Sequence, residues 1–193
     1  MATPERISDA LGPTATAGVL IAGAASAAPA AGWTANPGTT VADNGVVRLD
    51  STGTPFGTSL ENSNLSVPVH NGDTISFQYS GTCYAGGPRV FIQGGVFNTY
   101  DNNPNQCGGP VDANGYRTVT ATVHGIVDGT AGYTGIVNDS GPGSSSPASV
   151  ILVRNVTING VVLQLAAPVY KNHGQCVRSS DDKNAAAQSD CGK

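Results

Sequence analysis

The chain has 193 residues, which suits one domain with a terminal appendage, because a single hydrophobic core serves roughly 100 to 200 residues. Only 11% of the residues are charged and the net charge is -4, so the sequence excludes a cationic surface that would attract nucleic acid or anionic lipids. Short bursts of Val, Ile and Thr between Gly, Asn and Pro clusters exclude a disordered chain and predict a folded, β-rich protein.

The first segment of the chain has the features of an export signal. An apolar run covers residues 17–31 (AGVLIAGAASAAPAA); it is too short to span a bilayer, and its small residues suit signal peptidase. The start is atypical, because Arg6 is offset by nearby acidic residues, so a flexible Ala-rich leader is the alternative. We expect residues 1–31 to be a signal peptide or disordered leader, cleaved between about Ala28 and Gly32, and the mature protein to be secreted.

The middle of the chain has the alternation of a β protein. Apolar and polar residues alternate in short segments separated by turn residues, and no helical period lies between them. We expect an antiparallel β-sandwich or jelly roll over residues 32–168. Its nine predicted strands cover residues 46–50, 65–70, 74–80, 89–93, 96–100, 116–124, 132–137, 150–158 and 161–165.

Two turns test the strand register. A two-residue turn at Asn159-Gly160 pairs Ile158 with Val161, which puts the apolar side chains of that hairpin on one face. The same turn at Asn71-Gly72 would put the apolar sets on opposite faces. A three-residue loop over residues 71–73 restores their pairing; otherwise the strands on either side belong to different sheets.

The four cysteines form an even set without CxxC or HExxH spacing, which fits disulfides made in an oxidising compartment better than a zinc site. If Gly94-Gly95 is a two-residue hairpin turn, Cys83 and Cys107 lie nearly opposite each other at the open end of the hairpin. We therefore predict a Cys83–Cys107 disulfide, which leaves Cys176 to pair with Cys191.

The C-terminal residues 169–193 lose the strand alternation and end in an Ala-rich stretch, which predicts a short helix from about Lys183. Two cysteines 15 residues apart on one helix would be roughly 22 Å apart, beyond disulfide reach. We therefore expect a tail that folds back on itself, closed by the second disulfide.

The predicted Gly94-Gly95 hairpin also sorts its side chains. One face holds Val90, Ile92, Phe97 and Thr99, which we assign to the core, and the other holds Arg89, Phe91, Gln93, Val96, Asn98 and Tyr100. A sugar ring offers an apolar C–H face to aromatic rings and hydroxyls to polar groups, so the second face is a candidate glycan site. Its candidate ligand-binding residues are Arg89, Gln93, Asn98, Tyr100 and Asp101. The alternative is a solvated sheet surface whose rings pack against a loop.

Signatures of chemistry are absent from the sequence: it has no nucleophile elbow, P-loop, dinucleotide fingerprint or EF-hand loop. VPVHNGDTISFQY looks like part of a cupredoxin, but the only Met is Met1, and His70, His124 and His173 suit surface positions. The acidic residues sit in or beside predicted turns, where capping explains them. No cofactor is assigned; calcium is the one ion that clustered oxygens would suit, at residues 43–45 and 101–103.

Two stretches carry a family resemblance. GDTISFQYSG (residues 72–81) and ASVILVRNVTINGVVLQL (residues 148–165) resemble inner and closing strands of galactose-binding-like carbohydrate-binding modules, which implies a β-sandwich that binds sugar. The tail YKNHGQCVRSS (residues 170–180) is similar to tails of uncharacterised secreted actinobacterial proteins, which implies export from a bacterium.

Three function classes follow from the sequence. The first is a secreted, non-enzymatic binding module for a carbohydrate or cell-surface polymer, which the mixed face of the hairpin favours. The second is a structural or surface-coat exoprotein, which the many small turn residues suit. The third is a hydrolase whose site has no recognised motif, and only the clustered carboxylates support it.

Overall fold

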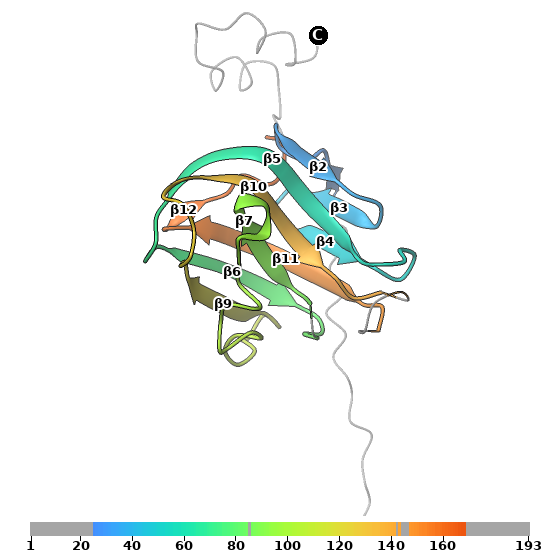
Figure 1. Cartoon of the computed structure of the whole chain (residues 1–193). Coiled ribbons are helices and arrows are strands. Elements are labelled where there is room, and N and C mark those ends of the chain that lie inside the picture. The colour runs from blue at the N-terminus through green and yellow to red at the C-terminus, as the bar shows by residue number, and fades with distance from the viewer. Residues whose placement is uncertain (1–24, 85, 142, 144–146, 169–193) are drawn as a thin grey trace, which may run out of the picture.

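The structure is a computed structural model that describes residues 25–84, 86–141, 143 and 147–168 (Figure 1). A single 3-10 turn, η1 (Gln93–Gly95), is the helical element in these ranges. The strands are β1 (Ser26–Ala27), β2 (Trp33–Ala35), β3 (Thr39–Ala42), β4 (Val47–Asp50), β5 (Thr58–Val69), β6 (Thr74–Ser80), β7 (Arg89–Ile92), β8 (Phe97–Asn98), β9 (Arg117–Thr122), β10 (Gly129–Asn138), β11 (Val150–Ile158) and β12 (Val161–Val162).

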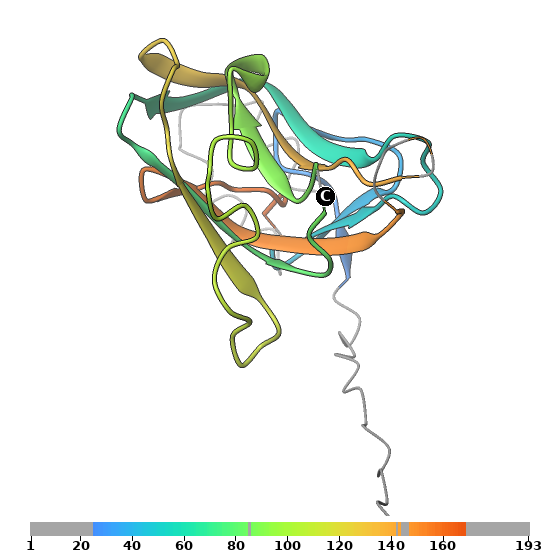
Figure 2. The same ribbon diagram turned by 60° about the horizontal axis from the view of Figure 1, so that its bottom comes forward.

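The strands form two antiparallel sheets. The seven-stranded sheet has the order β1-β3-β4-β11-β6-β9, with β12 paired to β11, and the five-stranded sheet has the order β2-β5-β10-β7-β8. Figure 2 shows the two layers nearly edge-on, with β7 and β10 above and β11 below. The predicted all-β class is confirmed, and the arrangement is sandwich-like.

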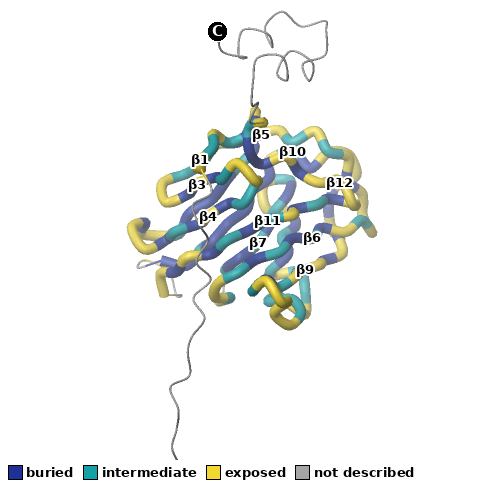
Figure 3. Tube along the Cα trace, turned by 180° about the vertical axis from the view of Figure 1, so that it is seen from behind, coloured by how far each residue is buried: buried dark blue, intermediate teal, exposed yellow. Residues whose placement is uncertain are grey.

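One hydrophobic core fills the space between the sheets. Along β6, Ile75, Phe77 and Tyr79 are fully buried, and along β7, Val90 and Ile92 are fully buried, while the residues between them face outward. This alternation follows from the two-residue period of a strand. It is visible along β4, β11 and β6 from the outside of the seven-stranded sheet (Figure 3). Each sheet therefore presents one outward face on which a ligand site can be built.

The nine predicted strands all exist, and the bounds of β6 and β11 match the prediction. The sequence did not predict β1, β2 or β3, nor that β5 begins at Thr58. The first half of β5 is rich in Ser, Glu and Asn, residues that strands usually avoid, and packing between β2 and β10 overrides that propensity.

The turn at residues 71–73 connects the two sheets. Val69 pairs with Gly129 in the five-stranded sheet, whereas Ile75 pairs with Ala121 in the seven-stranded sheet. The expected pairing of Val69 with Ile75 is therefore wrong, and the alternative of separate sheets is correct. Both side chains still reach the core, because the two sheets face it from opposite sides.

The Asn159-Gly160 hairpin is confirmed. Asn159 and Gly160 have positive φ values of 48° and 77°, as a two-residue hairpin turn requires. Ile158 pairs with Val161, and the Leu163 N–H donates to the Val156 carbonyl at 2.8 Å.

The first and last described segments lie side by side. The Ala30 N–H donates to the Leu165 carbonyl, and the Ala167 N–H donates to the Ala28 carbonyl, both at 2.9 Å. Ala30 is buried in the core, and β1 pairs with β3. The end of the expected leader, residues 25–31, thus packs with the sandwich.

The expected C-terminal tail lies outside the described residues, together with its helix from about Lys183 and its Cys176–Cys191 disulfide. Within the described part of the chain, no helix has the length and apolar character needed to cross a membrane.

Candidate functional site

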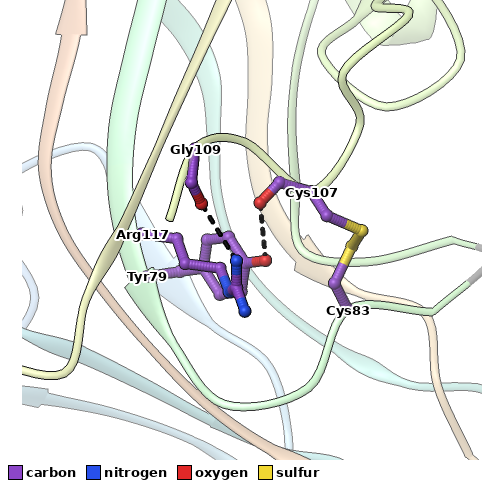
Figure 4. The surroundings of a disulfide bond; sticks show 5 residues. All are labelled: Tyr79, Cys83, Cys107, Gly109 and Arg117. Carbon is purple, nitrogen blue, oxygen red and sulfur yellow. Dashed lines mark hydrogen bonds between the residues drawn. A yellow bond between two sulfur atoms is a disulfide. The ribbon is translucent and has the colours of Figure 1, made fainter. Parts of the chain in front are cut away.

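The predicted Cys83–Cys107 disulfide is present, with the two Cα atoms 5.8 Å apart (Figure 4). It joins the segment after β6 to the loop after β8. Two side chains hold the same loop: the Tyr79 hydroxyl donates to the Cys107 carbonyl at 2.9 Å, and Arg117 Nη1 donates to the Gly109 carbonyl at 3.0 Å. The disulfide therefore belongs to a set of contacts that fixes the loop next to the candidate hairpin.

The hairpin of β7 and β8 has the predicted register. Phe91 lies opposite Asn98 and Ile92 opposite Phe97, and the Thr99 N–H donates to the Val90 carbonyl at 3.0 Å. The four residues assigned to the core, Val90, Ile92, Phe97 and Thr99, are fully buried. The Arg89-to-Tyr100 face therefore points away from the core, on the outside of the five-stranded sheet.

Three of the predicted site residues come together on this face. Arg89, Asn98 and Asp101 line one hollow, which we call the hairpin hollow. Asn98 is also a turn-forming residue, because its Oδ1 accepts the N–H groups of Tyr100 and Asp101 and its Nδ2 donates to Asp101 Oδ2 at 2.9 Å. Arg89 forms an ion pair with Asp139, which directly follows β10.

The other two predicted residues have different surroundings. Gln93 binds the loop before β10 and the start of that strand: its Nε2 donates to the carbonyls of Val127 and Thr130, at 2.6 and 3.1 Å, and its Oε1 accepts the Val127 N–H. Tyr100 is half-buried and does not line the hairpin hollow. The structure therefore gathers part of the predicted set and uses Gln93 to anchor a loop.

The hollows share Arg89 and Phe91. The hairpin hollow has a volume of about 230 Å³ and is lined by Arg89, Phe91, Gly94, Gly95, Asn98 and Asp101. A second hollow of about 440 Å³, which we call the β5 hollow, lies on the other side of Arg89 and Phe91. Its lining includes Asn36, Phe56, Ser59, Glu61, Arg89, Phe91, Val137 and Asp139.

An aromatic pair stands at the centre of the face. Phe91 of β7 lies directly opposite Gly135 of β10, and a side chain at Gly135 would collide with the Phe91 ring. Because Gly135 has no side chain, the Phe91 ring packs against β10. There it meets the Tyr133 ring edge-on, with the ring centroids 5.2 Å apart. The Tyr133 hydroxyl donates to Glu61 Oε2 at 2.7 Å, and this hydrogen bond raises the pKa of Tyr133.

Acidic groups flank the aromatic pair. Glu61 also accepts a hydrogen bond from the Ser59 hydroxyl at 2.7 Å. Burial raises the pKa of Asp139, although the Arg89 guanidinium beside it acts in the opposite direction. With Asp101 of the hairpin hollow, the face thus combines planar rings with a cation and three carboxyl groups.

Sequence reasoning missed Tyr133, Glu61, Asp139 and Phe56. Tyr133 was predictable from the sequence, because alternation along the predicted strand 132–137 places its side chain on the outward face. Glu61 was placed beside a turn, and that placement is wrong, because it lies inside β5. Asp139 follows β10, and only the fold reveals that it lies against Arg89.

Most of the other carboxylates organise turns, as predicted. Asp50 accepts the Thr52 N–H, Asp73 accepts the His70 N–H, and Asp112 accepts the N–H groups of Asn114 and Tyr116. The part of the chain that the structure describes contains no group of three or more His, Cys, Asp or Glu side chains suited to a metal ion.

Comparisons with protein-family models, with curated proteins and with solved structures find no match to this chain.

Proposed function

We propose that this protein is a non-enzymatic binding module that acts outside the cell and holds a carbohydrate or cell-surface polymer on the outer face of its five-stranded sheet. The observation that carries the proposal is the Phe91–Tyr133 pair. Phe91 lines both the hairpin hollow and the β5 hollow, and the Tyr133 ring packs edge-on against it. Arg89, Asp139 and Glu61 supply the polar groups beside the rings.

Sugar recognition explains the combination of residue types on this face. The C–H face of a pyranose packs on the exposed part of the rings, and its hydroxyl groups bond to carboxylates, amides or a guanidinium. Tyr133 is 43% exposed and Phe56 is 71% exposed, so both rings have surface available to a ligand. Two adjoining hollows suit successive units of a polymer better than a single small molecule.

The test begins with a glycan array probed with the purified protein, followed by affinity measurements on the strongest ligand. Gly135→Ala is the sharpest variant, because its new methyl group displaces the far end of the Phe91 ring and leaves the backbone in place. We expect Gly135→Ala and Tyr133→Ala each to weaken binding by about 1 to 3 kcal/mol, as the loss of a central aromatic contact does.

Val96→Ala is the matched control, because Val96 is exposed on the same hairpin but lines neither hollow and is not part of the Phe91–Tyr133 pair. It should leave the affinity unchanged. The proposal fails if no glycan binds, or if both site variants bind the array ligand as tightly as the unaltered protein does.

Hydrolysis is the second candidate, because Glu61 and Asp139 line the same β5 hollow, as the paired carboxylates of a glycosidase would. Both groups are already engaged, Asp139 by Arg89 and Glu61 by Tyr133 and Ser59, which favours a binding role. Release of new reducing ends from the array ligand, lost in Glu61→Gln, would favour the hydrolase instead.

A further inference from the structure

A third and larger hollow lies on the opposite side of the molecule, on the outer face of the seven-stranded sheet that Figure 3 presents. We call it the arginine groove. Its volume is about 730 Å³, and it runs over β3, β4 and β11 to the loop before β9. Its lining includes Asn44, Arg48, Asn114, Val150, Leu152 and Arg154.

Two guanidinium groups face the groove from neighbouring strands. Arg48 of β4 lies opposite Leu152 of β11, and Arg154 is two residues further along the same face. No acidic side chain is among the described residues that line the groove. Asp50 and Asp112 reach the guanidiniums from outside the lining, at 2.8 and 3.9 Å.

Arg154 is held in place before any ligand arrives. Its guanidinium lies over the Tyr116 ring, with Cζ 3.6 Å from the ring centroid, and its Nε donates to Gln78 Oε1 at 3.0 Å. A charged group that is already oriented loses less conformational freedom on binding than a free arginine would. Its Nη2 lies 3.9 Å from Asp112 Oδ2, beyond hydrogen-bond distance, which leaves N–H groups able to bond to a ligand.

The far wall of the groove is a loop built to keep its shape. Asp112 Oδ1 accepts the N–H groups of Asn114 and Tyr116, both at 2.8 Å, and the Asp112 N–H donates to the Tyr116 carbonyl at 2.7 Å. Arg117 and the disulfide fix the entry to this loop. Asn114 is therefore presented at the rim on a rigid support.

The floor of the groove combines apolar and polar groups. Val150 and Leu152 supply apolar surface, and the amides of Asn44 and Asn114 stand on either side. The floor strands β3, β4 and β11 each have neighbours on both sides, so their backbone groups are occupied by the sheet. An extended peptide, which is recognised largely through its backbone, would find few partners there.

We propose that the arginine groove binds a carboxylate-bearing sugar of an acidic polysaccharide. Guanidinium groups match the geometry of a carboxylate, the apolar floor accepts the C–H face of the ring, and the two amides bond to its hydroxyl groups. This inference does not rest on the binding function proposed for the five-stranded sheet, because the two sites share no residue.

The probe is hexagalacturonate, compared with its fully methyl-esterified form, which has the same rings without the charge. Calorimetry with the full chain should show binding of the acid and at least about tenfold weaker binding of the ester, since the charge-assisted bonds are lost. Added salt should weaken binding of the acid, because the arginine side chains are partly exposed, that of Arg48 by 45% and that of Arg154 by 28%.

The decisive variant is Leu152→Glu, which places a carboxylate between the two arginines, where the ligand's own carboxylate would sit. It should weaken binding at least about tenfold more than Leu152→Gln, which loses the same apolar side chain but adds no charge. Arg48→Gln should also weaken binding, whereas Arg89→Gln, on the opposite sheet, should leave it unchanged. Thermal unfolding of each variant shows whether the fold is intact.

Several results would overturn the proposal: equal binding of acid and ester, equal effects of Leu152→Glu and Leu152→Gln, or equally tight binding of poly-L-glutamate. If Arg89→Gln alone abolished hexagalacturonate binding, the binding site would lie on the five-stranded sheet instead. Gly135→Ala leaves the arginine groove untouched, so failure of one site is distinguishable from failure of the other.

Discussion

At the scale of single residues, a small polar network closes one end of the core. Ser51 Oγ donates to the Ser149 carbonyl at 3.0 Å and accepts the Ser149 N–H at 2.9 Å, and Asn138 Nδ2 lies within hydrogen-bond reach of both serines. All three side chains are buried, so each bond replaces one that water would otherwise make. Ser140 lies next to this network, but its hydroxyl takes no part in it.

The Ser140 hydroxyl is buried and has no hydrogen-bond partner in the described structure. Removing an unsatisfied polar atom relieves its desolvation cost, so we expect Ser140→Ala to raise the free energy of unfolding by about 1 kcal/mol. Chemical denaturation followed by the fluorescence of Trp33, the only tryptophan, measures this change.

Ser51→Ala is the control for that prediction, because its hydroxyl is as buried as that of Ser140 but makes hydrogen bonds. It should lower the free energy of unfolding by about 1 to 2 kcal/mol. A loss of stability in Ser140→Ala as large as that in Ser51→Ala would mean that the Ser140 hydroxyl has a partner after all.

At the scale of elements, side chains tie loops of the two sheets together. Asp128, just before β10, accepts the Asn71 N–H and the Asn71 Nδ2, both at 2.9 Å, and these hydrogen bonds lower the pKa of Asp128. The turn between β5 and β6 is thereby joined to the loop between β9 and β10.

The lowered pKa of Asp128 predicts a pH-dependent contribution to stability. The ionised carboxylate favours the folded state, so its contribution is present above the ordinary value of 3.8 and is lost as the pH falls through the folded pKa. Asp128→Asn should therefore melt at a lower temperature than the unaltered protein near neutral pH, and the difference should disappear in acid.

Melting curves of both proteins from neutral pH down to about pH 2 test this, within the range where carboxyl groups titrate. The control is Asp43→Asn, because the Asp43 side chain makes no hydrogen bond or ion pair with the residues that the structure describes. A melting difference for Asp128→Asn that stays constant down to the lowest pH would contradict the prediction.

Local patterns were enough to predict elements whose determinants are local. The Gly94-Gly95 turn fixes the register of β7 and β8, and with it the disulfide and the outward face of the hairpin. The partners of that face were not predictable in this way. Glu61, Gly135 and Phe91 line up across β5, β10 and β7 because of strand order, which alternation along one strand does not encode.

At the scale of the whole molecule, hollows lie on the outer faces of both sheets. The sequence pointed to one mixed face, on the hairpin, and it missed the arginine groove. Arg48 and Arg154 are 106 positions apart, and β4 and β11 become neighbours only through long-range pairing. A groove assembled from such strands leaves no motif in the sequence.

The contact between residues 28–30 and 165–167 has a mechanical consequence. Because the two segments are antiparallel, Ala28 lies opposite Ala167, at the end of the ladder nearest both outgoing chains. Tension between residues 25 and 168 first loads the Ala25–Asp43 hydrogen bond and the short β1–β3 pairing, and it then opens the hydrogen bonds of residues 28–30 with 165–167 one after another. Handles at the exposed positions Phe56 and Val127 would instead pull β5 and β10 from opposite ends and load their hydrogen bonds together in shear. Optical-tweezer pulling should thus give a lower first rupture force between residues 25 and 168 than across β5 and β10, which makes the sandwich weaker along the first direction than along the second.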